Sequence, residues 1–374
     1  SNFLSNIFLM KLFLYQDEKI KNFLPLTYLR SFSSLRLGFF KIIDYFKNLF
    51  PKTAIWEIDK LPINLERGYY LLIRFLPRER LEDWQENITF KYQGQVVGYY
   101  QYNDKKERRE INLDGFLLEN LWDLIKCQTE FSPIWQKSFR KEKLARNFSF
   151  RIYGRKDLVF INKNTKILGE LILNLEKGPI IIEEATLKGF NYLEGPCYIG
   201  KNTVIDNAKI RSFTTIGENC RISGEIEASV FLDFVNKHHE GFIGHSYIGS
   251  WVNLGAYTTN SDLKNNYSSV KIKIKNKIYD TKMLKFGCVI GDHTKTAIGT
   301  LIPTGAILGI CVNIKKGGPC EKFYPSFYWD KNKKWDFKRL IKTMEIVMAR
   351  RGEKLKKEDR ELLKKIYEKK DRPI

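Results

Sequence analysis

Apolar residues recur about every six residues through the middle of the chain, in the stretch YIGKNTVIDNAKIRSFTTIGENCRI. A branched residue occupies each step, at Ile199, Ile205, Ile210, Ile216 and Ile222, and a small residue lies two positions before each. This period fits neither an α-helix, which repeats every 3.6 residues, nor a simple alternating strand. It is typical of a parallel β-helix built from hexapeptides, in which each hexad forms one short strand and a turn.

The same pattern resumes further along the chain, in six Ile-Gly or Leu-Gly pairs. These pairs lie at 243–244, 248–249, 254–255, 290–291, 298–299 and 308–309. We expect the branched residue to fill the interior, the small residue to let the coil close, and the glycine to permit the turn. The alternative is a β-sandwich with Ile-Gly turns, but a sandwich has no reason to keep a period of six. We therefore predict a β-helix over residues 155–318.

The repeat is interrupted at about 260–285. NSDLKNNYSS has the composition of a turn, and VKIKIKNKIYD then alternates apolar residues with lysines, as a half-buried strand does. A loop that projects from a solenoid usually serves binding, so we expect this insertion to take part in a site.

Residues 10–150 mix strand-like and helical patterns, and we predict an α/β domain there. A strand is expected from about Met10, then a helix with Phe39, Ile42, Ile43 and Phe46 on one side. TAIWEI and GYYLLIRFL resemble strands, KYQGQVVGYYQY a hairpin, and LDGFLLENLWDLIKC a helix.

Residues 330–374 change to a helical pattern that breaks at Gly352 into two amphipathic segments. The apolar stripe of the first is Leu340, Met344 and Met348. We expect these helices to pack on the solenoid or on a neighbouring subunit as a cap.

The chain of 374 residues has 64 Lys and Arg against 43 Asp and Glu, a net charge of +21. This excess is spread along the chain and accompanies no nucleic-acid-binding motif, so anionic small molecules are the expected partners. No apolar run reaches the length of a membrane span, and we predict no membrane association. The six cysteines form no CxxC pair, which argues against a zinc site and indicates reduced thiols in the cytoplasm.

Only four histidines occur, and three of them, His238, His239 and His245, lie within eight residues. An imidazole is suited to accept a proton near neutral pH, although a histidine in a turn can equally be structural. His238 is expected on the opposite side of a strand from His239, and therefore in a structural role.

The run from Ser223 to Ala297 resembles a known bacterial family, in SGEIEASVFLDFVNKHHEGFIGHSYIGSWVNLGA, TTNSDLKNNYSSVKI and IGDHTKTAIGT. The family is that of alternative bifunctional UDP-N-acetylglucosamine diphosphorylase/glucosamine-1-phosphate N-acetyltransferases. FLPLTYLRSFSSLRLG at 23–38, PSFYW at 325–329 and MARR at 348–351 extend the resemblance over nearly the whole chain.

The resemblance implies a left-handed parallel β-helix that forms a homotrimer and transfers an acetyl group from acetyl-CoA to the amine of a sugar phosphate, most simply glucosamine-1-phosphate. It places His239 as the catalytic base. The residues that it assigns to the sugar phosphate are Arg211, Asn253, Asn266 and Tyr267, and Lys237 is a further candidate because phosphate groups attract cations. Those expected to contact acetyl-CoA are Ala256, Lys264, Asp292, Lys295 and Ala306. The sequence departs from the family at Phe242, which replaces a tyrosine, and at Tyr257, which replaces a glycine.

The first domain resembles a truncated nucleotidyltransferase, without a glycine-rich loop of the GxGTR kind. Arg30, Arg36 and Lys41 are its candidates for nucleotide phosphates, and Asp114 is a candidate ligand for Mg²⁺. Two alternatives to acetyl transfer therefore stay open. One is a sugar-1-phosphate nucleotidylyltransferase whose β-helix only trimerises and regulates, and the other is a non-catalytic scaffold.

Overall fold

The computed structural model describes residues 10–130, 150–330, 333–369 and 374. The chain divides into two compact units. The N-terminal unit runs to Phe23 and continues in Phe32–Ser34 and Phe40–Asp123. The second unit, here the solenoid unit, contains Leu24–Ser31 and Leu35–Phe39 as well as everything from Leu124 onward. Two short segments near the start of the chain thus pack with residues far from them in sequence.

A six-stranded sheet in the order β4-β1-β5-β8-β7-β9 forms the centre of the N-terminal unit. Its strands are β1 (Lys11–Tyr15), β4 (Ala54–Ile58), β5 (Gly68–Leu72), β7 (Ile88–Tyr92), β8 (Gln95–Gln101) and β9 (Arg109–Asn112). The predicted strand near Met10 and the predicted hairpin correspond to β1 and to the antiparallel pair β7–β8. The unit also contains α1 (Ile42–Leu49) and η1 (Glu18–Phe23), while η2 (Phe32–Ser34), β2 (Arg36–Leu37) and β3 (Phe40–Lys41) precede α1.

Two predicted elements of this region are divided in the structure. The run GYYLLIRFL gives β5 and a separate β6 (Phe75–Pro77), which pairs antiparallel with β10 (Gly115–Leu117). The helix expected over LDGFLLENLWDLIKC therefore begins only at α2 (Asp123–Glu130). The Asp123 carboxylate accepts hydrogen bonds from the backbone N–H groups of Glu119 and Asn120, and this fixes the start of the helix.

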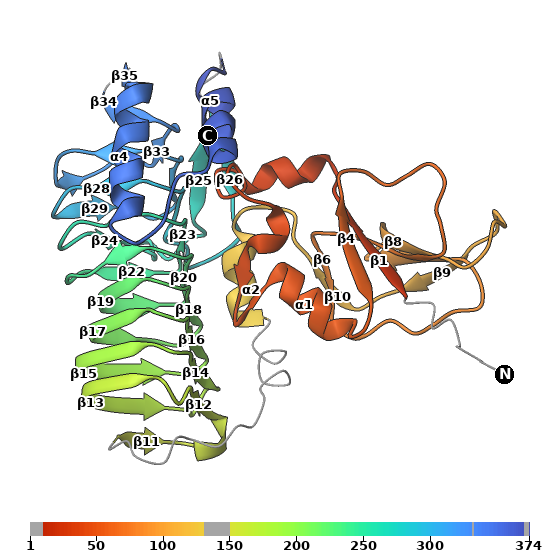
Figure 1. Cartoon of the computed structure of the whole chain (residues 1–374), viewed down its shortest axis with the longest axis horizontal. Helices are drawn as coiled ribbons and strands as arrows, with labels where there is room; N and C mark the ends of the chain where they lie inside the picture. The colour runs from red at the N-terminus through yellow and green to blue at the C-terminus, as the bar shows by residue number, and fades with distance from the viewer. Residues whose placement is uncertain (1–9, 131–149, 331–332, 370–373) are drawn as a thin grey trace. The chain divides into compact units, whose positions relative to one another are not determined.

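The hexad region is a parallel solenoid of the left-handed β-helix type, as predicted. Figure 1 shows its strands lying one above the next. One face is a nine-stranded sheet of β12 (Val159–Ile161), β14 (Ile180–Ile182), β16 (Cys197–Ile199), β18 (Thr214–Ile216), β20 (Val230–Phe231), β23 (Tyr247–Ile248), β27 (Cys288–Ile290), β30 (Ala306–Leu308) and β33 (Phe323–Tyr324).

The other faces begin with long strands that later coils divide into two. The long strands are β13 (Lys166–Asn174), β15 (Thr186–Glu194), β17 (Val204–Ile210) and β19 (Arg221–Glu227), and the short β11 (Arg151–Tyr153) precedes them. The first half of β19 pairs with β21 (Asn236–Lys237) and the second half with β22 (Phe242–Gly244). The short strands of the last coils are β24 (Thr259–Asn260), β28 (Lys295–Thr296), β29 (Thr300–Ile302), β31 (Asn313–Ile314) and β32 (Gly318–Pro319); η3 (Lys156–Leu158) precedes β12.

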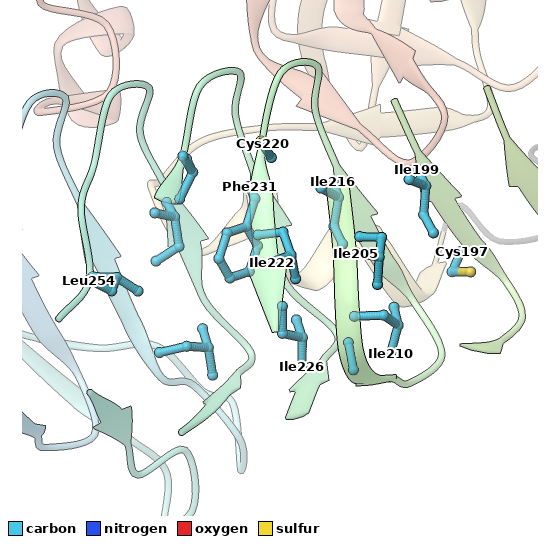
Figure 2. Packing of buried hydrophobic residues seen from close by; sticks show 14 of the residues in the cluster. Cys197, Ile199, Ile205, Ile210, Ile216, Cys220, Ile222, Ile226, Phe231 and Leu254 are labelled. Carbon is cyan, nitrogen blue, oxygen red and sulfur yellow. The ribbon is translucent and has the colours of Figure 1, made fainter. Parts of the chain in front are cut away.

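The branched hexad residues fill the interior of the solenoid, as Figure 2 shows. Ile199, Ile205, Ile210, Ile216 and Ile222 are fully buried in one cluster. Removing such a side chain from water stabilises the fold by roughly 1.5–3 kcal/mol. The hexad period is therefore the direct signature of the solenoid core.

Most of the glycines after the branched residues serve a different purpose from the turn that was expected. Gly291 does not adopt a left-handed backbone, but a Cβ there would lie 2.7 Å from the carbonyl carbon of Gly309 in the next coil. Close approach of successive coils therefore requires glycine. The pair Ile298-Gly299 does not follow the interior pattern, because Ile298 is 72% exposed and Gly299 has φ +65° in open space.

The insertion forms a hairpin, β25 (Lys271–Ile274) and β26 (Lys277–Asp280), which pair antiparallel. Val270 and Ile272 are fully buried, while Lys271 and Lys273 are exposed. The alternation thus predicted the half-buried strand β25, and the second strand completes the hairpin.

The C-terminal segments form α4 (Phe337–Ala349) and α5 (Lys357–Tyr367), after the short pair β34 (Tyr328–Asp330) and β35 (Lys333–Lys334). Gly352 lies between the helices with φ +76°, which glycine adopts readily. Leu340 and Met344 of α4 pack with Phe327 on the last coil, so the helices cover that end of the solenoid. Among the described helices, none is both long and apolar enough to cross a membrane.

Candidate active site

A buried lysine holds the corner of the coil that carries His239. Lys237 ends β21 with only 1% of its surface exposed, and its ammonium donates hydrogen bonds to the carbonyl oxygens of Ser223 (2.8 Å) and His239 (2.7 Å). Burial lowers its pKa to about 8, although the charge of Glu240 acts in the opposite direction. Lys237 was expected to bind the sugar phosphate. It is instead turned inward and committed to backbone carbonyls, so it positions the corner.

His239 itself lies at the surface of this corner, between β21 and β22. Its ring is 5.7 Å from that of His238 in an edge-to-face arrangement. The backbone N–H of Tyr257 donates to the Glu240 carbonyl oxygen at 2.9 Å, and a Cβ on Gly241 would meet the Thr258 carbonyl oxygen at 2.2 Å. The neighbouring coil therefore fixes the corner from the other side, while the His239 side chain stays accessible.

A cavity of about 510 Å³ opens beside this corner. It is lined by Phe190, Tyr192, Asn207, Ala208, Lys209, Gly224, Glu225 and Glu240. Its volume is within the range of small-molecule sites. Glu240, the residue next to His239, lies in its wall, so the imidazole is carried by the same turn as the cavity wall.

Arg211, a predicted sugar-phosphate ligand, lies among carboxylates next to this cavity. Its guanidinium is 3.4 Å from Glu225 and 3.6 Å from Glu194, and Lys209 is 3.5 Å from Glu225. Burial acts to raise the pKa of Glu194, but the charges of Lys177 and Arg211 outweigh it and lower the pKa. A phosphate entering here would compete with Glu225 for Lys209 and Arg211.

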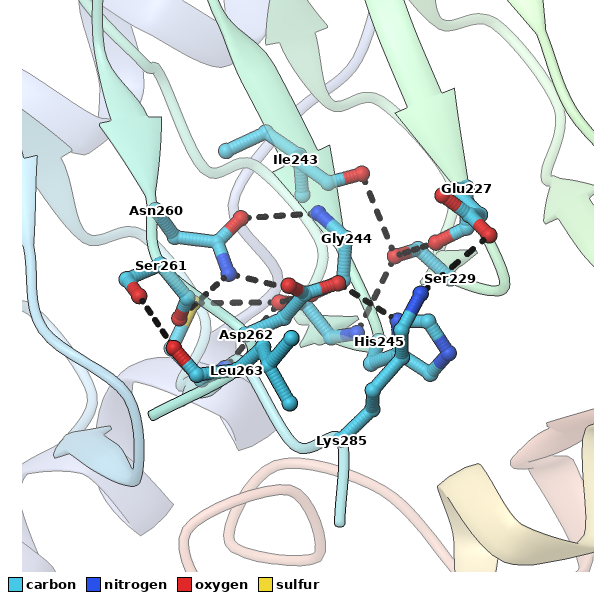
Figure 3. A network of polar contacts seen from close by, with 12 residues as sticks. Glu227, Ser229, Ile243, Gly244, His245, Asn260, Ser261, Asp262, Leu263 and Lys285 are labelled. Atoms are coloured by element: carbon cyan, nitrogen blue, oxygen red, sulfur yellow. Dashed lines mark hydrogen bonds and ion pairs between the residues drawn. The ribbon is translucent and has the colours of Figure 1, made fainter. Parts of the chain in front are cut away.

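A second imidazole forms a pair with a carboxylate that the sequence analysis did not predict. Nδ1 of His245 is 2.7 Å from Oδ2 of Asp262, and both side chains are nearly buried. Figure 3 shows this pair beside Lys285, whose ammonium is 3.8 Å from Glu227. Asn260 accepts from the N–H of Gly244 and donates to its carbonyl oxygen, which holds the strand that precedes His245. A separation of 17 residues, about one coil, is the signal that could have revealed the pair.

The residues expected to contact acetyl-CoA lie in different parts of the solenoid unit. Ala306 is fully buried in the core of β30, and Asp292 is 1% exposed and accepts from the Ser250 N–H at 2.8 Å. Neither side chain faces solvent. Lys295 is paired across adjacent coils with Asn253, a predicted sugar-phosphate ligand. Both line a second cavity of about 480 Å³, which Arg221, Arg350 and Arg351 also line.

The remaining expected ligands lie in or near the insertion. Lys264 donates to Ser268 and Ser269, Asn266 accepts from Ser268, and Tyr267 is 69% exposed. The Ala256 carbonyl oxygen accepts from the Gly299 N–H at 2.7 Å. Tyr257, which replaces the family's glycine, is 67% exposed with φ +59°. The structure does not bring these residues together with His239 in either cavity.

No family model matches the chain. Over 145 residues it is 36% identical to a bifunctional sugar-1-phosphate nucleotidylyltransferase/acetyltransferase of Sulfurisphaera tokodaii, covering 38% of this chain and 36% of the relative. It is 34% identical over 151 residues to the bifunctional protein GlmU of Methanocaldococcus jannaschii, covering 39% and 37%. It is 34% identical over 207 residues to GlmU of Methanococcus vannielii, covering 55% and 45%.

The chain is homologous to these GlmU-type proteins. This confirms the resemblance drawn from the sequence motifs. The chain spans less than half the length of each of these curated relatives. The likeness therefore covers part of each bifunctional protein.

The arginines predicted to bind nucleotide are held by the solenoid in this GlmU homologue. Arg30 forms an ion pair with Asp292 and donates to the Ser250 hydroxyl at 3.1 Å. Arg36 is 4% exposed and lies 3.2 Å from Glu218 and 3.3 Å from Asp233. Burial alone would lower the pKa of Arg36, but the charges of Asp233, Tyr198 and Glu218 raise it. Both guanidinium groups already have carboxylate partners, and the ion pairs anchor the segments Leu24–Ser31 and Leu35–Phe39.

The predicted metal ligand does not lie in a metal-binding cluster. Asp114 is 77% exposed and 3.4 Å from Arg78. The described residues contain no group of three or more His, Cys, Asp or Glu side chains that could hold a metal ion. Lys41, the third nucleotide candidate, belongs to β3 and is partly buried. These residues do not fit a Mg²⁺ site, and the nucleotide-binding role stays a prediction.

Proposed function

We propose that the solenoid unit is an acetyltransferase that moves the acetyl group of acetyl-CoA to the amine of a sugar phosphate, with glucosamine-1-phosphate as the acceptor. One observation carries the proposal: an internal lysine fixes the turn that carries His239, and the next residue of that turn, Glu240, lines a cavity together with Lys209 and Glu225. The Sulfurisphaera tokodaii relative is named as a sugar-1-phosphate nucleotidylyltransferase/acetyltransferase, which supports the same reaction.

Amide formation requires the amine to attack as a neutral nucleophile. In the proposed reaction the amine nitrogen forms a bond to the acetyl carbon, the carbon–sulfur bond breaks, and coenzyme A leaves as a thiolate. His239 accepts the proton that the nitrogen loses, which is suited to an imidazole at neutral pH. Such general-base assistance contributes about 10²–10⁴ in rate.

The acceptor phosphate would be recognised by Lys209 and Arg211. Both cations lie within 4 Å of Glu225, so they are already gathered at the edge of the cavity. A phosphate dianion offers charge-assisted hydrogen bonds to both groups and would displace the single carboxylate. Glu225 then acts as a placeholder that keeps the two cations together in the free protein.

We further propose a homotrimer in the cytoplasm. The exposed position of His239 leaves room for a neighbouring subunit to complete the site, and mass spectrometry of the intact assembly would test the trimer. All six cysteines are free thiols, which supports a reducing compartment. We do not extend the proposal to nucleotidylyl transfer, because Arg30 and Arg36 are paired with solenoid carboxylates and Asp114 lies outside any metal cluster.

The proposal is tested by measuring thiol release from acetyl-CoA in the presence of glucosamine-1-phosphate. His239→Gln should lower kcat by about 10²–10⁴. His238→Gln is the matched control, since it alters the adjacent imidazole and should retain most activity. His245→Gln tests whether the second imidazole, rather than that of His239, acts as the base. Full activity in His239→Gln, or loss confined to His245→Gln, would remove His239 from the mechanism.

A further inference from the structure

The second cavity, of about 480 Å³, is formed by a column of polar residues and the end of a helix. Arg221, Asn236, Asn253 and Lys295 occupy matching positions on successive coils, as their parallel pairing shows. Residues at the same register of stacked coils project on the same side. The cavity therefore has a continuous polar floor along the solenoid.

The C-terminal end of α4 supplies the opposite wall. Val347, Arg350 and Arg351 line the cavity together with the coil residues. Figure 1 shows α4 running alongside the end of the solenoid that carries β28 and β29. Met344 and Met348 bury the apolar side of this helix, which fixes the two arginines that follow. The two arginines of the MARR string therefore lie at the cavity.

Four cations face this cavity without a neutralising acid. They are Arg221, Lys295, Arg350 and Arg351, and no carboxylate residue lines the cavity with them. In the described part of the chain, none of the four lies within ion-pair distance of a carboxylate. Arg30 and Arg36, which also belong to the solenoid unit, do have such partners. The cavity thus differs from its surroundings in leaving its positive charge uncompensated.

The positive groups are also close enough to oppose one another. Burial lowers the pKa of the Arg221 guanidinium, and the charge of Arg351 lowers it further. Burial likewise lowers the pKa of Lys295, whose ammonium donates only to the His293 carbonyl oxygen, at 3.3 Å. An anion in the cavity would relieve both the desolvation and the mutual repulsion.

The cavity also offers neutral contacts of the kind a nucleoside uses. Asn253 accepts a hydrogen bond from Asn236 at 2.7 Å, which leaves its own amide N–H₂ as a donor. Phe234 and Trp251 stack on each other with ring centroids 4.1 Å apart and both line the cavity. Both residues are partly exposed and contribute apolar surface to the lining. The volume is sufficient for a ligand of nucleotide size.

We propose that this cavity between the α4 terminus and the solenoid binds the diphosphate of a nucleoside diphosphate, with Arg221, Lys295, Arg350 and Arg351 contacting the phosphates. Arginine binds phosphate in bidentate geometry, and three guanidinium groups suit two phosphate groups. Two sources share this chemistry: the nucleotide portion of coenzyme A and a nucleotide-sugar. The inference does not depend on the role of His239.

Calorimetric titration of the full chain with ADP, UDP, UDP-N-acetylglucosamine, acetyl-CoA and pyrophosphate tests the proposal. Arg351→Gln and Arg350→Gln should each weaken nucleoside diphosphate binding about tenfold to 100-fold, the loss of a charge-assisted hydrogen bond. Lys342→Gln is the matched control, because it removes one charge from the exposed side of the same helix and should not change binding. Helical circular dichroism verifies that α4 is retained.

The different ligands in the titration distinguish coenzyme A from a nucleotide-sugar as the source of the diphosphate. Binding of ADP and acetyl-CoA without UDP-N-acetylglucosamine assigns the cavity to the coenzyme, and the reverse assigns it to a nucleotide-sugar. His239→Gln should bind these ligands as the unaltered protein does, so a failed transfer assay leaves this result intact. Absence of binding at millimolar ligand, or equal weakening by Lys342→Gln and Arg351→Gln, would overturn the proposal. Pyrophosphate binding as tightly as ADP would contradict a nucleoside contribution.

Discussion

Because the ammonium of Lys237 is buried, the free energy of unfolding should change with pH in the alkaline range. Its folded-state pKa of about 8 lies below the ordinary value of 10.5 for lysine. Each unit of this difference corresponds to about 1.4 kcal/mol, so keeping the amine charged inside the coil costs about 3 kcal/mol. Its two charge-assisted hydrogen bonds to carbonyl oxygens, each worth about 1.5–3 kcal/mol, offset that cost.

The sign of the pH dependence follows from proton binding. Between pH 8 and 10.5 the unfolded chain holds a proton on this lysine that the folded chain has released. The free energy of unfolding therefore rises with pH across this window, by about 3 kcal/mol in total. Below pH 8 both states are protonated and the cost is constant. Lys237→Met removes the titrating group, so the free energy of unfolding of the natural protein minus that of this variant should increase with pH, by up to about 3 kcal/mol.

Urea unfolding of both proteins at pH 7, 8, 9 and 10, followed by circular dichroism, measures this gap. Lys271→Met, on the exposed side of β25, controls for general effects of removing a lysine and should show a constant difference. Lys237→Met should also lower acetyl transfer about tenfold or more, because the His239 carbonyl loses its donor and the corner loosens. A gap that stays the same from pH 7 to pH 10 would show that this amine is not desolvated, and the account of the corner would fail.

Two further predictions concern the solenoid. Ile222→Ala should lower the free energy of unfolding by about 2–5 kcal/mol. Ile298→Ala, at a site 72% exposed, should change it by less than about 0.5 kcal/mol. Urea unfolding of both variants measures the difference, and equal losses would contradict the assigned core. Arg30→Met should lower the free energy of unfolding by about 3–5 kcal/mol because it leaves Asp292 charged and buried. The added change Asp292→Asn should restore part of the loss, as measured by the thermal midpoint. If the effects of the two single changes simply add in the double variant, the two residues do not interact.

The solenoid could be predicted because its core repeats along the sequence. Every coil needs a branched residue inside, so Ile199 to Ile222 mark it without knowledge of distant contacts. The role of the glycines was harder to predict, since the close approach at Gly291 depends on the neighbouring coil. The burial of Lys237 was hidden for the same reason, because its partner Ser223 belongs to the preceding coil.

The candidate site was predictable in part. A matched motif predicts His239, and the structure places it on an accessible corner; its catalytic role stays a prediction. The cavity with Arg350 and Arg351 was missed, because it requires α4 to pack beside coils more than 50 residues earlier in the chain. The pairing of Arg30 and Arg36 with solenoid carboxylates likewise depends on contacts over about 180 to 260 residues, which no local pattern contains.

The placement of Leu24–Ser31 and Leu35–Phe39 in the solenoid unit has a consequence for dissecting the protein. A fragment that starts at residue 124 would retain every coil but would lose Arg30 and Arg36, leaving Asp292, Asp233 and Glu218 without their counter-ions. It would also lose the backbone groups of Arg36 that bond to the hydroxyl of Tyr247. Expressing only residues 124–374 would thus give an unstable fragment. Deleting only Phe40–Asp123 and joining the ends with a short linker would preserve the contacts of Arg30 and Arg36.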